Sequence, residues 1–105
     1  MAPGKLVRDR IPDIIMKEGR RPVVRTLEGE AFLSALYDKL AEEHRELLAA
    51  KSEDERLEEL ADIVEVVLSL AARLGVSESD LMGLVARKRA ERGGFSEGFF
   101  YEGDV

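Results

Sequence analysis

The sequence has 105 residues, of which 45% are hydrophobic and 36% are charged, with a net charge of −6 and no cysteine. A chain of this length builds one domain, here expected to span residues 1–105, around a small core. The negative charge argues against binding of a nucleic-acid polymer, which needs a basic face. The missing cysteines exclude disulfides and thiolate metal sites and fit a reducing cytoplasm.

The first 28 residues predict little regular structure apart from one short helix. Pro12 suits the first turn of a helix that ends at Gly19. The following stretch, RPVVRTL, reads as a short extended segment because Val23 and Val24 are β-branched. The segment MAPGKLVRDR lacks the apolar run of a signal peptide, so we expect a cytoplasmic protein.

A long helix is predicted over residues 29–50. Leucines recur there on one stripe, at the spacing i, i+3, i+7 and i+14. They are Leu33, Leu36, Leu40 and Leu47. Glu43 takes the stripe position between Leu40 and Leu47, so a carboxylate is expected among core side chains.

Two further helices are predicted over about residues 53–74 and 77–92. Ser52 and Ser77 are their expected N-caps, and Gly75 separates them. In the last helix the side chains expected to face inward are Leu81, Leu84 and Val85. The tail FSEGFFYEGDV carries three of the four phenylalanines, so at least part of it is expected to pack back on the chain.

The helix over residues 53–74 is apolar around most of its circumference. At about 100° per residue, its polar residues from position 60 onward fall within an arc of roughly 80°. They are Asp62, Glu65, Ser69 and Arg73. A surface helix needs an apolar stripe of only about 100°, so this helix must be covered on several sides. We therefore predict a homodimer or homotetramer. We predict no contact with a membrane, because the apolar run from Ile63 to Leu74 is too short and too charged to span one.

Four carboxylates form two pairs at helical spacing, Glu43 with Glu46 and Glu59 with Asp62. Residues three apart lie on the same helix face, with Cβ atoms about 5–6 Å apart. If the two helices pack antiparallel, the four groups meet in a half-buried seam and repel one another unless something neutralises them. Either Lys and Arg partners or a divalent metal can do so. Oxygen ligands without His or Cys favour Mg²⁺, with Mn²⁺ as the alternative, over Zn²⁺.

The segment KLAEEHRE, followed after twelve residues by ELAD, fits the E-E-x-x-E…E-x-x-D signature. With it the chain resembles the MazG-like, all-α nucleoside triphosphate pyrophosphohydrolases, a superfamily that includes the phosphoribosyl-ATP pyrophosphohydrolases. KLVRDRIPDII and KRAERGGFSEG resemble its small branch of predicted house-cleaning enzymes, and the resemblance covers residues 5 to about 98. It implies a helical bundle, assembled as a homo-oligomer, that uses Mg²⁺ to cleave a nucleoside triphosphate between its α- and β-phosphates.

The resemblance also implies roles for individual residues. Glu43, Glu46, Glu59 and Asp62 correspond to the family's metal-binding carboxylates. The candidates for orienting or deprotonating the attacking water are Glu42, Glu46 and Glu65, and the choice among them stays open. Basic residues are expected to hold the phosphates. Each of them could instead form an ordinary ion pair or compensate the dipole at a helix end. They are Lys39, Lys88, Arg92, Arg8 and Arg10.

Two alternatives remain at this point. The first is a phosphoribosyl-ATP pyrophosphohydrolase of histidine biosynthesis, although Glu65 stands where those enzymes tend to carry an aromatic or histidine-containing stretch. The second is a noncatalytic helical assembly protein, in which Arg and Lys side chains satisfy the carboxylates of the seam.

Overall fold

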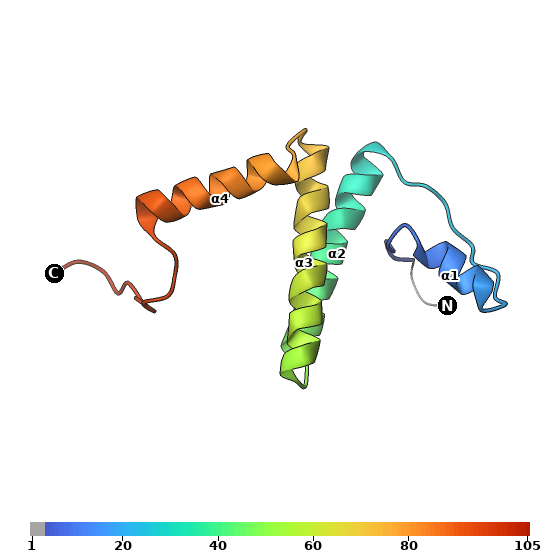
Figure 1. Ribbon diagram of the computed structural model, residues 1–105, viewed down its shortest axis with the longest axis horizontal. Coiled ribbons are helices and arrows are strands. Elements are labelled where there is room, and N and C mark those ends of the chain that lie inside the picture. Colours follow the sequence, from blue (N-terminus) through green and yellow to red (C-terminus); the bar gives the residue numbers. More distant parts are fainter. Residues whose placement is uncertain (1–3) are drawn as a thin grey trace.

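The computed structural model describes residues 4–105, which form helices joined by irregular segments (Figure 1). The helices are α1 (Ile11–Lys17), α2 (Gly29–Ala49), α3 (Glu53–Arg73) and α4 (Glu78–Arg92). None of these described residues belongs to a strand. The prediction of an all-α chain is confirmed, and every predicted helix is found close to its predicted ends.

Serine side chains begin α3 and α4, as the sequence predicts. Ser52 Oγ accepts a hydrogen bond from the Glu55 N–H, and Ser77 Oγ accepts one from the Asp80 N–H, both at 3.1 Å. The Glu55 carboxylate reaches back to the Lys51 N–H at 2.8 Å, one residue before the reciprocal position of a capping box. Gly75, at φ +75°, follows α3 in the left-handed conformation that ends many helices.

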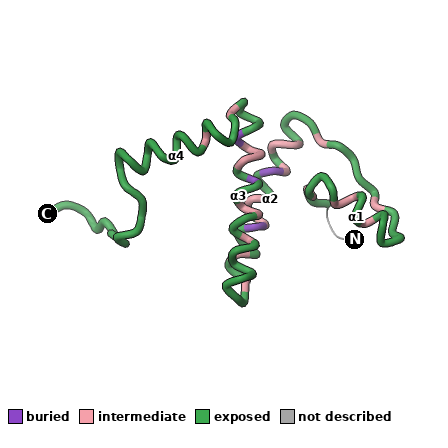
Figure 2. Tube along the Cα trace, viewed as in Figure 1, coloured by how far each residue is buried: buried purple, intermediate pink, exposed green. Residues whose placement is uncertain are grey.

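Helices α2 and α3 lie side by side as an antiparallel hairpin (Figure 1). Its seam contains most of the buried positions of the described chain, seen as short purple stretches in Figure 2. Leu36 from α2 is 2% exposed and Val66 from α3 is 7% exposed. Glu43 is buried with them at 4% exposure, which confirms that the leucine stripe of α2 contains a carboxylate.

The polar arc of α3 faces α2. The Arg73 guanidinium lies 5.5 Å from the centre of the Phe32 ring and donates a 3.5 Å hydrogen bond to the Gly29 carbonyl, both on α2. Asp62, on the same arc, approaches Glu43 in the seam. The opposite face of α3 is apolar and open, and we call it the outer face of α3; it consists of Leu57, Leu60, Val64, Val67 and Leu74. Nothing within one described chain covers it, and the homo-oligomer stays a prediction.

Helix α4 projects away from the hairpin (Figure 1), and the molecule measures 62 × 35 × 23 Å along its principal axes. The prediction of an inward-facing stripe on α4 is therefore wrong for two of its three members. Leu81 is half-buried, but Leu84 and Val85 are 42% and 38% exposed. The physical reason is that no other described element lies beneath the middle of α4 in a single chain.

The tail after α4 does not pack back, so that prediction is also wrong. Phe95 is fully exposed, and Phe99 and Phe100 are exposed at 90% and 84%. The tail leaves the end of α4 that lies far from the hairpin (Figure 1). Among the described helices, none combines the length and the apolar character needed to cross a bilayer.

Candidate metal centre

The seam of the hairpin brings the predicted carboxylates together. One oxygen each from Glu43, Glu59 and Asp62 lies within 4.8 Å of the others, and the same holds for Glu42, Glu43 and Glu46. Glu43 belongs to both groups, because it is the member buried between the two helices. We call these five residues the acidic cluster.

Two oxygen atoms of the acidic cluster are buried without a hydrogen-bond partner, Glu43 Oε2 and Glu59 Oε2. A buried acceptor without a partner costs about 1–3 kcal/mol, and more when it carries charge. A divalent cation between the two helices would satisfy both atoms at once. The residues present therefore fit a hard cation such as Mg²⁺ or Mn²⁺, which binds through oxygen ligands.

The electrostatics of Glu59 reflect this crowding. The neighbouring Glu43 carboxyl, loss of hydration and the charge of Glu46 raise the pKa of Glu59 to about 7. Two ionised carboxylates cannot hydrogen-bond to each other, so without a metal ion a shared proton relieves their repulsion. Near neutral pH a cation therefore competes with a proton for this pair.

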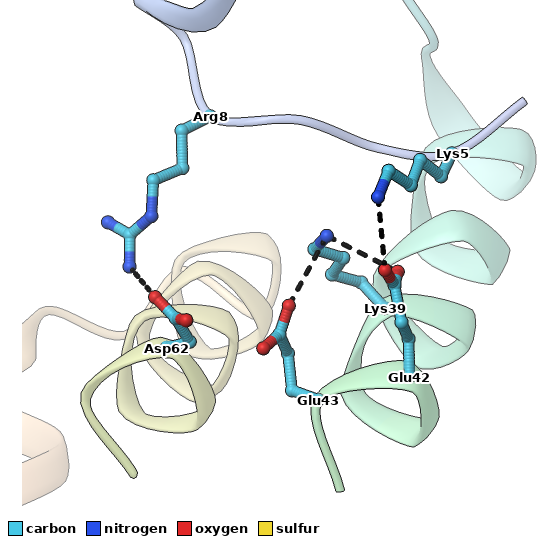
Figure 3. A network of polar contacts seen from close by, with 6 residues as sticks. All are labelled: Lys5, Arg8, Lys39, Glu42, Glu43 and Asp62. Carbon is cyan, nitrogen blue, oxygen red and sulfur yellow. Dashed lines mark hydrogen bonds and ion pairs between the residues drawn. The ribbon is translucent and has the colours of Figure 1, made fainter. Parts of the chain in front are cut away.

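One side of the acidic cluster already has a cation. Lys39 Nζ lies 3.2 Å from Glu42 and 3.3 Å from Glu43, one turn earlier on α2 (Figure 3). Burial opposes the charge of Lys39, but its hydrogen bonds to Glu42 and Glu43 outweigh that effect, so the pKa of Lys39 is raised. The surface ion pair considered for Lys39 is present, although this lysine is half-buried.

The N-terminal strap, which we define as residues 4–10, adds two more cations. Arg8 donates to Asp62 at 2.6 Å, and Lys5 Nζ lies 3.4 Å from Glu42 (Figure 3). The bond to Asp62 is the main cause that raises the pKa of Arg8. The sequence predicts a phosphate contact or an ion pair for Arg8 and does not single out Lys5. The only available signal was that both belong to KLVRDR, because the path of an irregular segment cannot be read from periodicity.

The remaining candidates are not brought to the acidic cluster within one chain. Lys88 and Arg92 are exposed on α4, which projects away from the hairpin (Figure 1). Arg10 is exposed just before α1. Glu65 is exposed one turn after Asp62, near enough for its charge to contribute to the raised pKa of Arg8.

The fold and the acidic cluster together define an all-α protein with a candidate divalent-cation centre between two helices. Residues 16–89 match the family described as phosphoribosyl-ATP pyrophosphohydrolase, and the chain therefore belongs to that family, within the MazG-like all-α superfamily. The matched residues include all of α2 and α3 and thus the whole acidic cluster. The resemblance drawn from the motifs is confirmed.

A curated relative is an uncharacterized protein of Mycolicibacterium smegmatis (strain ATCC 700084 / mc(2)155), 52% identical over 55 residues. The alignment covers 52% of this chain and 56% of the relative, so the chain spans about half the length of the curated protein it matches. No solved structure matches the chain.

Proposed function

We propose that the protein is a Mg²⁺-dependent nucleotide pyrophosphohydrolase. It would cleave a nucleoside triphosphate between the α- and β-phosphates, giving a monophosphate and pyrophosphate, with nonstandard nucleotides as a possible class of substrate. Membership of the family supports the chemistry. The observation that carries the proposal is the buried Glu43, whose Oε2 lacks a hydrogen-bond partner beside Glu59 and Asp62.

In this proposal Glu43, Glu59 and Asp62 hold the ion from the two sides of the seam. Glu46, exposed at the rim of the acidic cluster, is the fourth ligand. Bound Mg²⁺ supplies neutralisation of phosphate charge and a lower pKa for a coordinated water. The chain itself contributes a rigid frame, because these ligands stand on two packed helices.

The surroundings of the three candidate bases differ. The pKa of Glu42 is lowered, because its contacts with Lys39 and Lys5 outweigh the opposing effect of burial. A carboxylate that already accepts from two ammonium groups is a poor acceptor for a proton from water. This argues for Glu46 or Glu65 as the residue that orients or deprotonates the attacking water.

Among the basic residues, Lys39 and Arg8 are close enough to the acidic cluster to hold phosphates in the same chain. Lys88 and Arg92 would act only in an assembly in which α4 of one copy reaches the hairpin of another. The same assembly would cover the outer face of α3. We assign no phosphate contact to Arg10, which is exposed at the start of α1.

Phosphoribosyl-ATP is the second candidate substrate, because it gives the matching family its description. It carries the same triphosphate, so the acidic cluster would serve both reactions. The difference lies in what surrounds the base and the sugar, and no residue of the acidic cluster selects between them.

The test is pyrophosphate release with Mg²⁺ from ordinary nucleoside triphosphates, modified ones and phosphoribosyl-ATP. Asp62→Ala removes a proposed ligand and should lower the rate about 1,000-fold or more, equivalent to roughly 4 kcal/mol of transition-state stabilisation. Glu58→Ala, an exposed neighbour on the same helix, is the matched control and should keep parental activity. If the parent cleaves none of these nucleotides, or if Asp62→Ala is as active as Glu58→Ala, the proposed function is wrong and the assembly protein becomes the better account.

A further inference from the structure

Glu42 joins two ammonium groups from different parts of the chain. Its Oε1 lies 3.4 Å from Lys5 on the N-terminal strap, and its Oε2 lies 3.2 Å from Lys39 on α2 (Figure 3). The two lysines are 34 positions apart in sequence, so only the path of the strap across the hairpin brings them together. One carboxylate thus holds two positive charges side by side.

Both lysines at Glu42 keep donors for a further acceptor. An ammonium group has three donors, so each lysine can keep its bond to Glu42 and still donate to another acceptor. Lys39 also contacts Glu43, so this pair of lysines borders the acidic cluster.

A groove of about 370 Å³ runs between the strap and α2 at this point. Its basic lining residues are Lys5, Lys39 and Arg45, and its acidic ones are Asp38 and Glu42, which leaves a net charge of +1. The volume lies within the range of small-molecule sites, about 300–1,000 Å³. Glu42 lines the groove and belongs to the acidic cluster, so the groove adjoins that cluster.

We propose that Lys5 is a phosphate-binding residue of the substrate, acting with Lys39, and that Glu42 is a positioning residue that holds both ammonium groups. The inference rests on the proposed function: phosphates held at the acidic cluster continue toward the groove, and the paired lysines donate to their oxygens. Glu42 is then neither the base nor a metal ligand.

A purely structural role for Lys5 accounts poorly for its contact with Glu42. Its side chain is 62% exposed, and an exposed ion pair contributes little to stability. An attachment of the strap alone would not need a second ammonium group on the same carboxylate. A phosphate chain that extends beyond the acidic cluster needs positive charge there, and Lys5 and Lys39 supply it.

The test measures binding of inorganic tripolyphosphate to the full chain by calorimetry, with Mg²⁺ present throughout. Lys5→Gln should weaken binding about tenfold, the loss expected for one charge-assisted contact, and Lys5→Arg should restore most of it. Lys17→Gln, which removes an exposed lysine of α1, is the matched control and should bind as the parent does. The melting temperature, and the affinity for Mn²⁺ alone measured by electron paramagnetic resonance, should be the same in all four proteins.

The positioning role of Glu42 is tested by a double-mutant cycle on the same binding constant. If Glu42 holds Lys5 in place, the effect of Lys5→Gln should shrink to about threefold or less in a Glu42→Gln background. An undiminished tenfold effect in that background would overturn the positioning role.

The outcomes separate this inference from the proposed function. If nucleotides are cleaved but Lys5→Gln binds tripolyphosphate as the parent does, Lys5 is not a phosphate ligand and the proposed function stands. If no nucleotide is cleaved but Lys5→Gln still weakens binding selectively, the proposed function fails and the anion site stands. A parent that does not bind tripolyphosphate, or a loss shared by Lys17→Gln, overturns the inference.

Discussion

Soluble proteins usually bury apolar side chains and expose charged ones, and two regions of this molecule depart from that pattern in opposite ways. They are the seam of the α2–α3 hairpin and the arm, by which we mean α4 with the tail that follows it. The seam buries the charged Glu43, at 4% exposure, whereas the arm exposes Leu84, Val85 and Phe95. In a completed protein, buried charge is neutralised and large apolar surfaces are covered. The comparison teaches that the two regions are incomplete in different ways: the buried Glu43 has Lys39 beside it and one oxygen without a hydrogen-bond partner, whereas the apolar side chains of the arm have no cover within the described chain.

Helix α3 shows the same contrast between its two faces. Asp62 and Val66 point toward α2, whereas Leu60 and Val64 belong to the outer face of α3 and are 46% and 53% exposed. A change on one face should therefore affect metal binding, and a change on the other should affect association. Three predictions use this separation, from the largest expected effect to the smallest.

The largest effect is expected from Val64→Asp, on the outer face of α3. Val64 is 53% exposed in one chain, so the change would be nearly neutral in a monomer. In an oligomer that covers this face, the new carboxylate would be buried without a partner, at a cost of several kcal/mol. We expect smaller assemblies in sedimentation velocity and a melting temperature about 20 °C or more lower.

His44→Asp, on an exposed position of α2, is the control for the added charge and should keep the parental mass and melting temperature. A Val64→Asp protein that keeps both would show that the outer face of α3 is open in solution, contrary to the predicted oligomer.

An intermediate effect is expected from Mg²⁺ on the parent protein. At a concentration of about 100 times the dissociation constant, a ligand that binds only the folded state stabilises it by about 2.7 kcal/mol. For a domain near 100 residues this raises the melting temperature by roughly 10–20 °C, and EDTA should reverse it. The measurement is thermal unfolding followed by circular dichroism.

Asp62→Asn removes one charge from the acidic cluster and should abolish most of this Mg²⁺ effect, whereas Glu58→Gln should retain it. A full shift in Asp62→Asn would place the ion outside the seam, and no shift in the parent would favour a seam satisfied by Lys39 and Arg8 alone.

The smallest effect is expected from pH in the metal-free protein. The pKa of Glu59 is raised from its ordinary value of 4.5 to about 7 in the folded state, so between these values the folded chain binds a proton that the unfolded chain has lost. The stabilisation from this proton is complete below pH 4.5 and is lost as the pH rises through about 7. Denaturant unfolding across this range should show stability falling with pH.

Glu59→Gln cannot titrate and should flatten that part of the profile, whereas Glu58→Gln should leave it unchanged. Equal slopes in the parent and in Glu59→Gln would show that Glu59 is not the titrating group.

The sequence predicts the helices and the acidic cluster because both depend on local spacing. The caps at Ser52 and Ser77 follow from a serine with an acidic residue three positions later, and the place of Glu43 on the leucine stripe follows from the 3.6-residue period. The contact of Lys5 with Glu42 could not be predicted, since the strap has no periodicity to fix its path. The direction of α4 and the exposure of Phe95 were also missed, because a single-chain argument assumes that apolar side chains find cover within the chain.

Glu43 has a further consequence for how this hairpin can change. A leucine at this position would complete the row from Leu40 to Leu47 and remove the unpartnered oxygen, so the helices would pack more stably. The same replacement would take away the group shared by both halves of the acidic cluster. Stability and the proposed cation site thus make opposite demands on one side chain, and a design that stabilises the seam would remove that site first.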